Sequence, residues 1–235
     1  MKRTLFRFFL LAAAAAALVS CFPSEDFLFS EVSMCTVLGR NKIQNDGGDI
    51  YYIVKNSAGT DISDTLKRVM VSLDVMSAVE GKSNEYNAHL MQMAGAFVKA
   101  PLRASTLDEE AVGNDGVKID QAWVSGGYLN LHVQVAMLYP SAAEHTLNIV
   151  FDDVRSTSDT LYFEMRHNAH GESPENPSQN PASFTFAGAY ASFPLTGILD
   201  NGRKPVFHLE WEWYDGDEYS ITNTKTRHSG DIKPD

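Results

Sequence analysis

The fold is decided by the stretch Tyr128-Leu129-Asn130-Leu131-His132-Val133-Gln134-Val135-Ala136-Met137. Its large apolar side chains stand at every second position, and polar or small side chains fill the positions between them. Successive side chains of a β-strand point to opposite faces of the sheet, so a period of two places one face in a core and the other in water. The stretch therefore predicts a half-buried β-strand.

The same period of two recurs along the chain, in Arg68–Met76, His145–Phe151, Leu161–Arg166 and Val206–Tyr214. Glycine-containing turns punctuate these runs, and Tyr219–Thr222 is expected to close a final hairpin. Only two short helices are expected, around Asp64–Lys67 and near Leu107–Val112. The pattern predicts an all-β protein.

A break in strand patterning between residues 100 and 117 suggests a domain boundary. Pro101, the acidic stretch Asp108-Glu109-Glu110 and the turn-forming Gly113-Asn114-Asp115-Gly116 all fall there. We therefore expect one β domain over residues 34–104, a larger one over 117–228, and a frayed tail over 229–235.

The first residues are typical of a bacterial lipoprotein. Three basic residues precede a short apolar core, which ends in Leu18-Val19-Ser20-Cys21. This arrangement predicts a signal peptide over residues 1–20 and a lipid-bearing Cys21, followed by a flexible leader over residues 21–33. An ordinary secretory signal that happens to contain a cysteine is the alternative. Acyl chains on Cys21 would anchor the chain to the outer membrane without a spanning helix, on its periplasmic face or on the cell surface.

The charge balance argues against nucleic acid as a partner. Without the three basic residues of the signal, 16 basic residues face 30 acidic ones, a net charge of −14. Such a surface repels phosphate backbones. Cys35 is the one cysteine besides Cys21, so no internal disulfide is expected, and a buried, unreactive thiol is favoured.

Two motifs resemble those of a known family. These are Trp123-Val124-Ser125-Gly126-Gly127-Tyr128-Leu129-Asn130 and Arg166-His167-Asn168-Ala169-His170-Gly171-Glu172. Together they resemble the NigD-like lipoproteins of Bacteroidetes, although Glu172 stands where Asp is commoner. The resemblance implies a small OB-like barrel followed by an antiparallel, Ig-like β-sandwich. It also implies a proposed role in bacteriocin immunity.

The second motif holds the densest polar cluster, formed by Arg166, His167, Asn168, His170 and Glu172. The two histidines and Glu172 could bind a metal if the chain turned at Asn168. The favoured alternative is architectural. Arg166 would then pair with a carboxylate, His167 and Asn168 would hydrogen-bond to loop backbone, and Gly171 would adopt a positive φ. No metal site is therefore expected.

The first motif could supply an aromatic platform of Trp123 and Tyr128 for a glycan or peptide. The favoured alternative is a core tryptophan followed by a glycine turn. Trp211 and Trp213 share a strand face with Phe207 and Leu209, so that face is expected to lie in the core.

No catalytic or cofactor motif stands out. The chain has no nucleophile elbow, no phosphate-binding glycine loop and no zinc-protease helix. We therefore expect a non-catalytic envelope lipoprotein that binds an unknown protein, peptide or glycan. One alternative is a hydrolase of envelope or dietary polymers, with paired carboxylates in a cleft at the domain junction. Another is a structural subunit of a surface complex.

Overall fold

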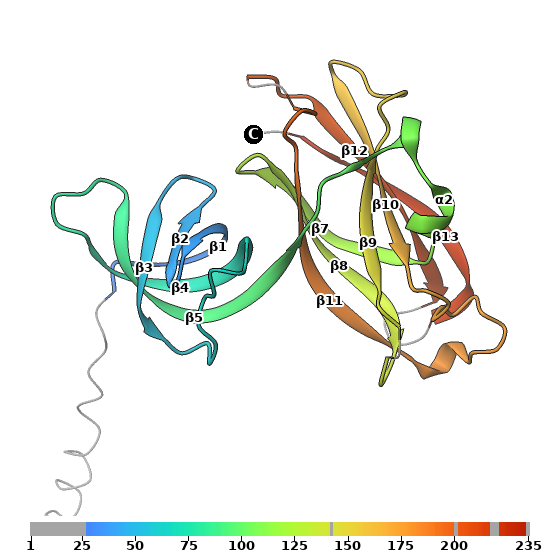
Figure 1. Cartoon of the computed structure of the whole chain (residues 1–235), viewed down its shortest axis with the longest axis horizontal. Helices are drawn as coiled ribbons and strands as arrows, with labels where there is room; N and C mark the ends of the chain where they lie inside the picture. The colour runs from blue at the N-terminus through green and yellow to red at the C-terminus, as the bar shows by residue number, and fades with distance from the viewer. Residues whose placement is uncertain (1–26, 142, 200–201, 217–220, 234–235) are drawn as a thin grey trace, which may run out of the picture.

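The computed structural model describes residues 27–141, 143–199, 202–216 and 221–233, and the fold is almost entirely β (Figure 1). The first strands are β1 (Phe29–Gly39), β2 (Lys42–Asn45), β3 (Ile50–Asn56), β4 (Arg68–Ala78) and β5 (Glu85–Val98). The later ones are β6 (Leu102–Arg103), β7 (Val117–Ser125), β8 (Tyr128–Leu138), β9 (Thr146–Phe151), β10 (Thr160–Asn168), β11 (Phe184–Pro194), β12 (Val206–Gly216) and β13 (Ile221–Ile232). The helical pieces are η1 (Ala104–Thr106), α2 (Glu109–Val112) and η2 (Pro181–Ser183).

The first five strands form a small barrel. They pair in the order β3-β2-β1-β4-β5, and a parallel pairing of β3 with β5 closes the ring. Alternate side chains fill the interior, which includes the fully buried Ile43, Tyr51, Leu73 and Leu90. This order and closure are those of an OB-like barrel, as expected.

The later strands form a β-sandwich. Strands β11, β8 and β7 face a second sheet with the order β13-β12-β10-β9-β6. The alternating apolar residues of β8 meet those of β10 and β12 in one core, where Leu131, Phe163 and Phe207 are at most 1% exposed. The sandwich is mixed rather than purely antiparallel, because β10 runs parallel to β12 and β6 runs parallel to β9.

Barrel and sandwich share one sheet. The end of the long β5 leaves the barrel, and its residues Ala96–Val98 pair in parallel with Tyr190–Ser192 of β11 (Figure 1). The barrel strands and β11-β8-β7 are therefore one continuous eight-stranded sheet. Leu102 and Arg103, placed by sequence at the end of the first domain, pair instead with β9 of the second sheet.

Each alternating run became a strand, but three local predictions were wrong. Asp64–Lys67 is a turn without a helix, in which the Ser63 carbonyl accepts from the Leu66 amide. The predicted leader ends early, because β1 begins at Phe29 and pairs with β4 from its first residue. The predicted tail is a strand as far as Ile232, which pairs with Phe207.

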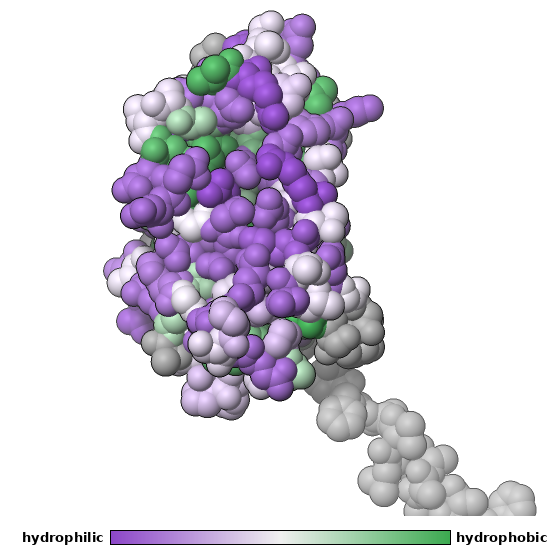
Figure 2. Space-filling view, turned by 90° about the vertical axis from the view of Figure 1, so that its right-hand side faces the viewer, coloured by the Kyte–Doolittle hydropathy of each residue, from purple (hydrophilic) through white to green (hydrophobic). Residues whose placement is uncertain are grey.

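The far side of the sandwich is a polar surface. Figure 2 shows that the side carrying α2 and β13 is mostly hydrophilic. Ion pairs cross the outer face of the second sheet, among them Arg227 with Glu210 and Arg155 with Glu210. Of the helices in the described ranges, none has the length and apolar character needed to cross a bilayer.

Candidate functional site at the junction of barrel and sandwich

A buried ion pair lies where the barrel meets the sandwich. Arg68 of β4 has no exposed surface, and its guanidinium donates to both carboxylate oxygens of Asp46, at 2.9 and 2.7 Å. Asp46 lies in the turn between β2 and β3. A buried charge is tolerated only when it is paired and fully hydrogen-bonded. The rest of the guanidinium must therefore find partners in the surrounding strands.

Those partners come from both bodies. On the barrel side, Arg68 donates to Thr36 Oγ1 at 2.9 Å. On the sandwich side it donates to Ser192 Oγ at 3.2 Å and to Asn130 Oδ1 at 3.3 Å. Its guanidinium also lies 4.1 Å from the ring centroid of Tyr128, a cation–π distance. One arginine thus connects β1 and β4 of the barrel with β8 and β11 of the sandwich.

The turn between β7 and β8 closes around Asp46. Ser125 Oγ donates to Asp46 Oδ2 at 2.5 Å, and Asn130 Nδ2 donates to Ser125 Oγ at 3.1 Å. Gly126 has φ +58°, and a Cβ atom there would lie 2.3 Å from Asp46 Oδ1. Only glycine allows this approach. We call this set of residues, centred on Arg68 and Asp46, the junction clasp.

A groove opens beside the junction clasp. It has a volume of about 490 Å³ and lies between β1, β4 and the β2–β3 turn of the barrel and β7 of the sandwich. Its lining includes Glu31, Met34, Met70, Gln121 and Trp123. This size is within the range of small-ligand sites in proteins.

The structure separates the two aromatic residues of the first motif. Trp123 lies outside the sandwich core and lines the groove, so its interpretation as a core residue was wrong. Its β7 neighbours Ala122 and Val124 point to the core instead, as the strand period requires. Tyr128 lies against Arg68 and does not belong to the described lining of the groove. Trp211 packs on the sandwich core and Trp213 on a smaller apolar cluster, as expected.

Comparison with known proteins agrees with this architecture. The model of the NigD-like C-terminal beta sandwich domain matches residues 100–224, more than half of the chain. The chain belongs to the NigD-like family. No curated protein sequence matches it significantly.

Solved structures show the same two-part fold. A NigD-like immunity protein from Bacteroides caccae ATCC 43185 is 20% identical, with a TM-score of 0.59 over 92% of this chain and 100% of that one. A candidate lipoprotein from Bacteroides fragilis NCTC 9343 is 13% identical, with a TM-score of 0.60 over 87% and 98%. A protein of unknown function from Bacteroides vulgatus ATCC 8482 is 19% identical, with a TM-score of 0.60 over 86% and 90%.

The second motif of this NigD-like chain fastens the segment that precedes β7. Arg166 donates to Gly113 O at 2.8 Å and pairs with Glu109 at 2.8 Å. His167 contacts the carbonyl of Gly116, and Asn168 donates to that of Ala111. Gly171 has φ +88°. These are the contacts that the architectural interpretation predicts.

The same motif contains a chain of buried hydrogen bonds. Because the Gly116 carbonyl can only accept, His167 Nδ1 donates to it at 3.0 Å, and His167 Nε2 then accepts from His145 Nδ1 at 3.0 Å. His145 Nε2 lies 3.3 Å from Glu172 Oε1, an ion pair when His145 carries both protons. Burial lowers the pKa of His167 to about 4, which keeps its ring neutral.

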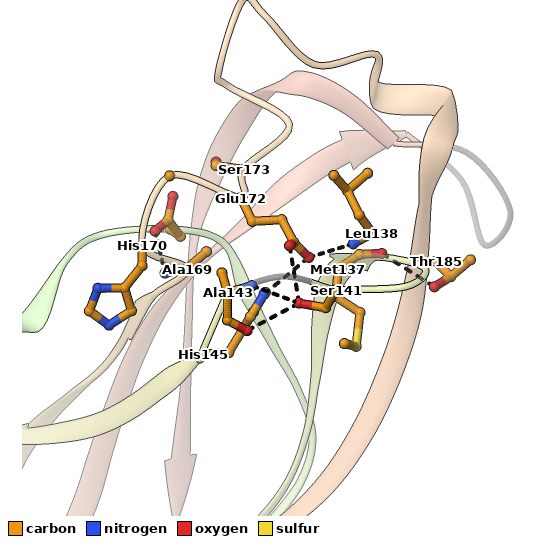
Figure 3. Close-up of polar contacts among 12 residues, drawn as sticks. Met137, Leu138, Ser141, Ala143, His145, Ala169, His170, Glu172, Ser173 and Thr185 are labelled. Atoms are coloured by element: carbon orange, nitrogen blue, oxygen red, sulfur yellow. Dashed lines mark hydrogen bonds and ion pairs between the residues drawn. The ribbon is translucent and has the colours of Figure 1, made fainter.

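Glu172 closes a loop and is not available to a metal. Figure 3 shows its carboxylate directed at the Leu138 amide and the Ser141 hydroxyl, while His170 points away from it. The Leu138 amide donates to the carboxylate at 2.6 Å and the Ser141 hydroxyl at 3.0 Å. His170 contacts Thr146 instead, so the turn at Asn168 does not bring the two histidines of the motif together. Across the described ranges, no three His, Cys, Asp or Glu side chains are placed to hold a metal ion.

Two further predictions concern the cysteines. Cys35 is fully buried in the barrel, and burial raises the pKa of its thiol to about 12, so it is protonated and unreactive at neutral pH. Cys21 lies outside the described residues.

Several site residues gave no signal in the sequence. Arg68 begins an alternating strand, Asp46 belongs to a glycine turn, and Ser192 belongs to a strand that was not predicted. His145 falls within a predicted strand and has no other signal. For the residues around Asp46, the sequence predicts only the glycine turn at Gly126-Gly127, without its partner.

Proposed function

We propose that this chain is a non-catalytic, lipid-anchored protein of the cell envelope that binds a ligand in the groove at the junction. The supporting observation is the junction clasp. It holds barrel and sandwich together through a fully buried arginine, so the groove between them has fixed walls. A preformed site binds without the entropic cost of ordering its walls.

The lipid anchor is supported by the sequence and by one neighbour. Leu18-Val19-Ser20-Cys21 follows a short apolar core, and the Bacteroides fragilis neighbour is named as a candidate lipoprotein. Phe27, the first described residue, is six residues from Cys21, so the barrel would lie within about 20 Å of the membrane surface. Both the periplasmic face of the outer membrane and the cell surface fit this arrangement.

Fractionation of cells that make a Cys21→Ser variant tests the anchor. We expect the variant to leave the membrane fraction, whereas the native protein stays there and incorporates radiolabelled palmitate. Ser20→Ala, which keeps a small residue before the cysteine, is the matched control and should stay bound. A Cys21→Ser variant that remains fully membrane-associated would refute the anchor.

A binding role fits the groove better than hydrolysis does. The groove holds two carboxylates, Asp46 and Glu31, as the hydrolase alternative requires. Both Asp46 oxygens accept from Arg68. Glu31 accepts from Asn45 and from the buried Tyr51 hydroxyl, and burial beside Glu31 raises the pKa of Tyr51 well above its ordinary value. Neither carboxylate is left free to transfer a proton to a substrate.

Bacteriocin immunity is one form that this binding could take. The Bacteroides caccae neighbour is named a NigD-like immunity protein. The acidic balance of the chain, 30 acidic against 19 basic residues, would favour a basic toxin over an acidic one.

Expression of the full chain in a bacteriocin-sensitive strain tests the immunity role. We expect the native protein to raise the inhibitory bacteriocin concentration and a Trp123→Ala variant to lose this protection. Equal protection by both proteins would place immunity outside the groove. The structural-subunit alternative predicts cross-links to a fixed set of surface proteins even in the Trp123→Ala variant.

A further inference from the structure

The groove beside the junction clasp continues along the barrel. A second cavity of about 250 Å³ lies between β4, β5 and Tyr190 of β11. Both cavities are lined by Val32 and Met70, so they form one elongated groove with Trp123 towards one end and Tyr190 towards the other. Such a shape suits an extended chain rather than a compact molecule.

The lining of this extended groove carries polar groups that face solvent. The indole N–H of Trp123, the hydroxyl of Tyr190 and the amides of Gln92 and Gln121 form no hydrogen bond to any residue that the structure describes. Gln92 and Gln121 are exposed, and Trp123 and Tyr190 are half-buried, so a ligand can reach these groups. Side-chain amides offer donors and acceptors in one plane. The groove therefore presents aromatic rings together with free hydrogen-bonding groups.

The charges of the lining restrict the ligand further. No Lys, Arg or His belongs to the described lining of either cavity. The carboxylates of Glu31 and Asp46 are already hydrogen-bonded within the protein. Of the basic groups next to the lining, Arg68 is paired with Asp46. His132 has its ring centroid 4.7 Å from that of Tyr190 and its Nδ1 3.2 Å from Asp120. An acidic ligand therefore meets no Lys or Arg among the described lining residues, whereas a polar, uncharged ligand fits this lining without an ion pair.

Side chains on the strand faces line most of the groove. Strand β4 lies between β1 and β5, and the second cavity opens over the faces of these strands. Because the backbone of β4 is paired with both neighbours, a chain bound over it is recognised by side chains. Among the described strands, β1 before Cys35 and β7 each have one edge without a partner, so a peptide that adds to such an edge is the competing outcome of the test below. A pyranose ring suits this recognition, because it has an apolar C–H face for an aromatic ring and hydroxyls at its edge for amides.

From these observations we propose that the groove binds a neutral oligosaccharide across Trp123 and Tyr190. This inference rests on the proposed binding role of the groove and adds the class of ligand.

Calorimetric titration of the full-length protein in detergent tests it. The probes are neutral hexasaccharides: cellohexaose and mannohexaose for plant and yeast polymers, and chitohexaose for N-acetylated chains like those of bacterial walls. Polygalacturonate oligomers serve as the anionic comparison. We expect at least one neutral probe to bind at least 10-fold more tightly than the anionic one. The probe that binds identifies the source.

Variants of the lining provide the second readout. Trp123→Ala and Gln121→Ala should each weaken binding of that probe at least 10-fold. Trp213→Phe, in the apolar cluster around Ile221 and Phe186, should leave binding unchanged. All variants should unfold within a few degrees of the native protein, because neither Trp123 nor Gln121 belongs to a core cluster of the described residues.

Three results would overturn the proposal: no binding of any neutral probe, tighter binding of the anionic probe, or neutral binding that Trp123→Ala does not change. If a protein or peptide partner binds through the groove while the saccharides fail, the oligosaccharide inference is wrong and the proposed binding role stands. If neither binds, both fail.

Discussion

At the scale of single residues, Arg68 and His167 show two ways of burying a titratable group. Arg68 keeps its charge, because Asp46 and three neutral oxygens satisfy its donors. His167 gives up its charge, because burial disfavours the charged ring and outweighs the hydrogen bond to the Gly116 carbonyl, which favours it. The first arrangement makes the structure sensitive to mutation, and the second makes it sensitive to pH.

Arg68→Met should destabilise the protein by about 3–5 kcal/mol, because Asp46 would be left mostly buried without its partner. Arg40→Met is the matched control. Arg40 forms a single exposed ion pair with Asp61, and its loss should cost less than about 1 kcal/mol. Urea unfolding measures both. A cost of less than 1 kcal/mol for Arg68→Met would show that the buried pair is not what holds the junction.

His167 should make stability fall with acid. Its folded pKa of about 4 lies below the ordinary 6.5, so between these values the unfolded chain binds the proton and the folded chain does not. The free energy of unfolding should therefore drop as pH falls from 6.5 to 4, by up to about 3 kcal/mol. His167→Asn should remove this part of the slope in urea titrations. His208→Asn, at the exposed face, should keep it, and an unchanged slope in His167→Asn would contradict the assignment.

At the scale of elements, the backbone conformation of the β7–β8 turn determines how this turn packs against Asp46. Gly126 and Gly127 both have positive φ, as a two-residue hairpin turn with type I′ geometry requires. Their surroundings differ. A Cβ atom on Gly126 would clash with the Asp46 carboxylate, whereas a Cβ atom on Gly127 would have no neighbouring atom within 4 Å. Substitutions at Gly127 therefore test the turn conformation alone, whereas substitutions at Gly126 also test the packing of the turn against Asp46.

Gly127→Ala should cost about 1 kcal/mol, from the left-handed backbone alone. Gly126→Ala should cost at least about 2 kcal/mol more, because the carboxylate held by Arg68 must also move. Thermal unfolding of the two variants under the same conditions measures the difference. Equal losses of stability in the two variants would mean that close packing of the turn against Asp46 does not contribute to stability.

The elements that could be predicted from sequence are the strands with one face exposed to solvent and the other in the core. Strands β4, β8, β10 and β12 alternate strictly and were predicted close to their bounds. Strands β5 and β11 were missed, because exposed small residues such as Gly95 and Gly188 interrupt their pattern. The sequence predicts a tail at the end of β13, because Thr222–Asp231 has almost no apolar side chain. The segment is a strand because it pairs with β12.

Removal of residues 229–235 tests that last correction. Ser229–Ile232 pair with Phe207–Glu210, so their loss would expose the outer edge of β12. We expect faster amide hydrogen exchange along β12 and a lower melting temperature, with β4 of the barrel unaffected. Unchanged exchange in β12 would mean that the final residues are a dispensable tail.

At the scale of the whole molecule, the sequence divided the chain into two domains and the structure joins them. Strand β5 belongs to the barrel at its start and to the sandwich at its end. The clasp joins side chains from Thr36 to Ser192, and no local pattern can predict contacts so far apart in sequence. For the second motif, the residue types predicted the kind of contact but not the partners, because Ala111, Gly113 and Gly116 lie more than 50 residues away in sequence. The position of Trp123 could not be predicted, because it depends on both the barrel and the sandwich.

The central claim is that the groove at the junction is the surface that meets a ligand. Photo-cross-linking in intact cells tests it most directly, with a benzophenone amino acid at position 32, which lines both cavities of the groove, or at position 162 on the outer face of the sandwich. Benzophenone inserts into C–H bonds of proteins and glycans alike. We predict a discrete adduct from position 32 and none from position 162. An adduct from position 162 alone would contradict the account.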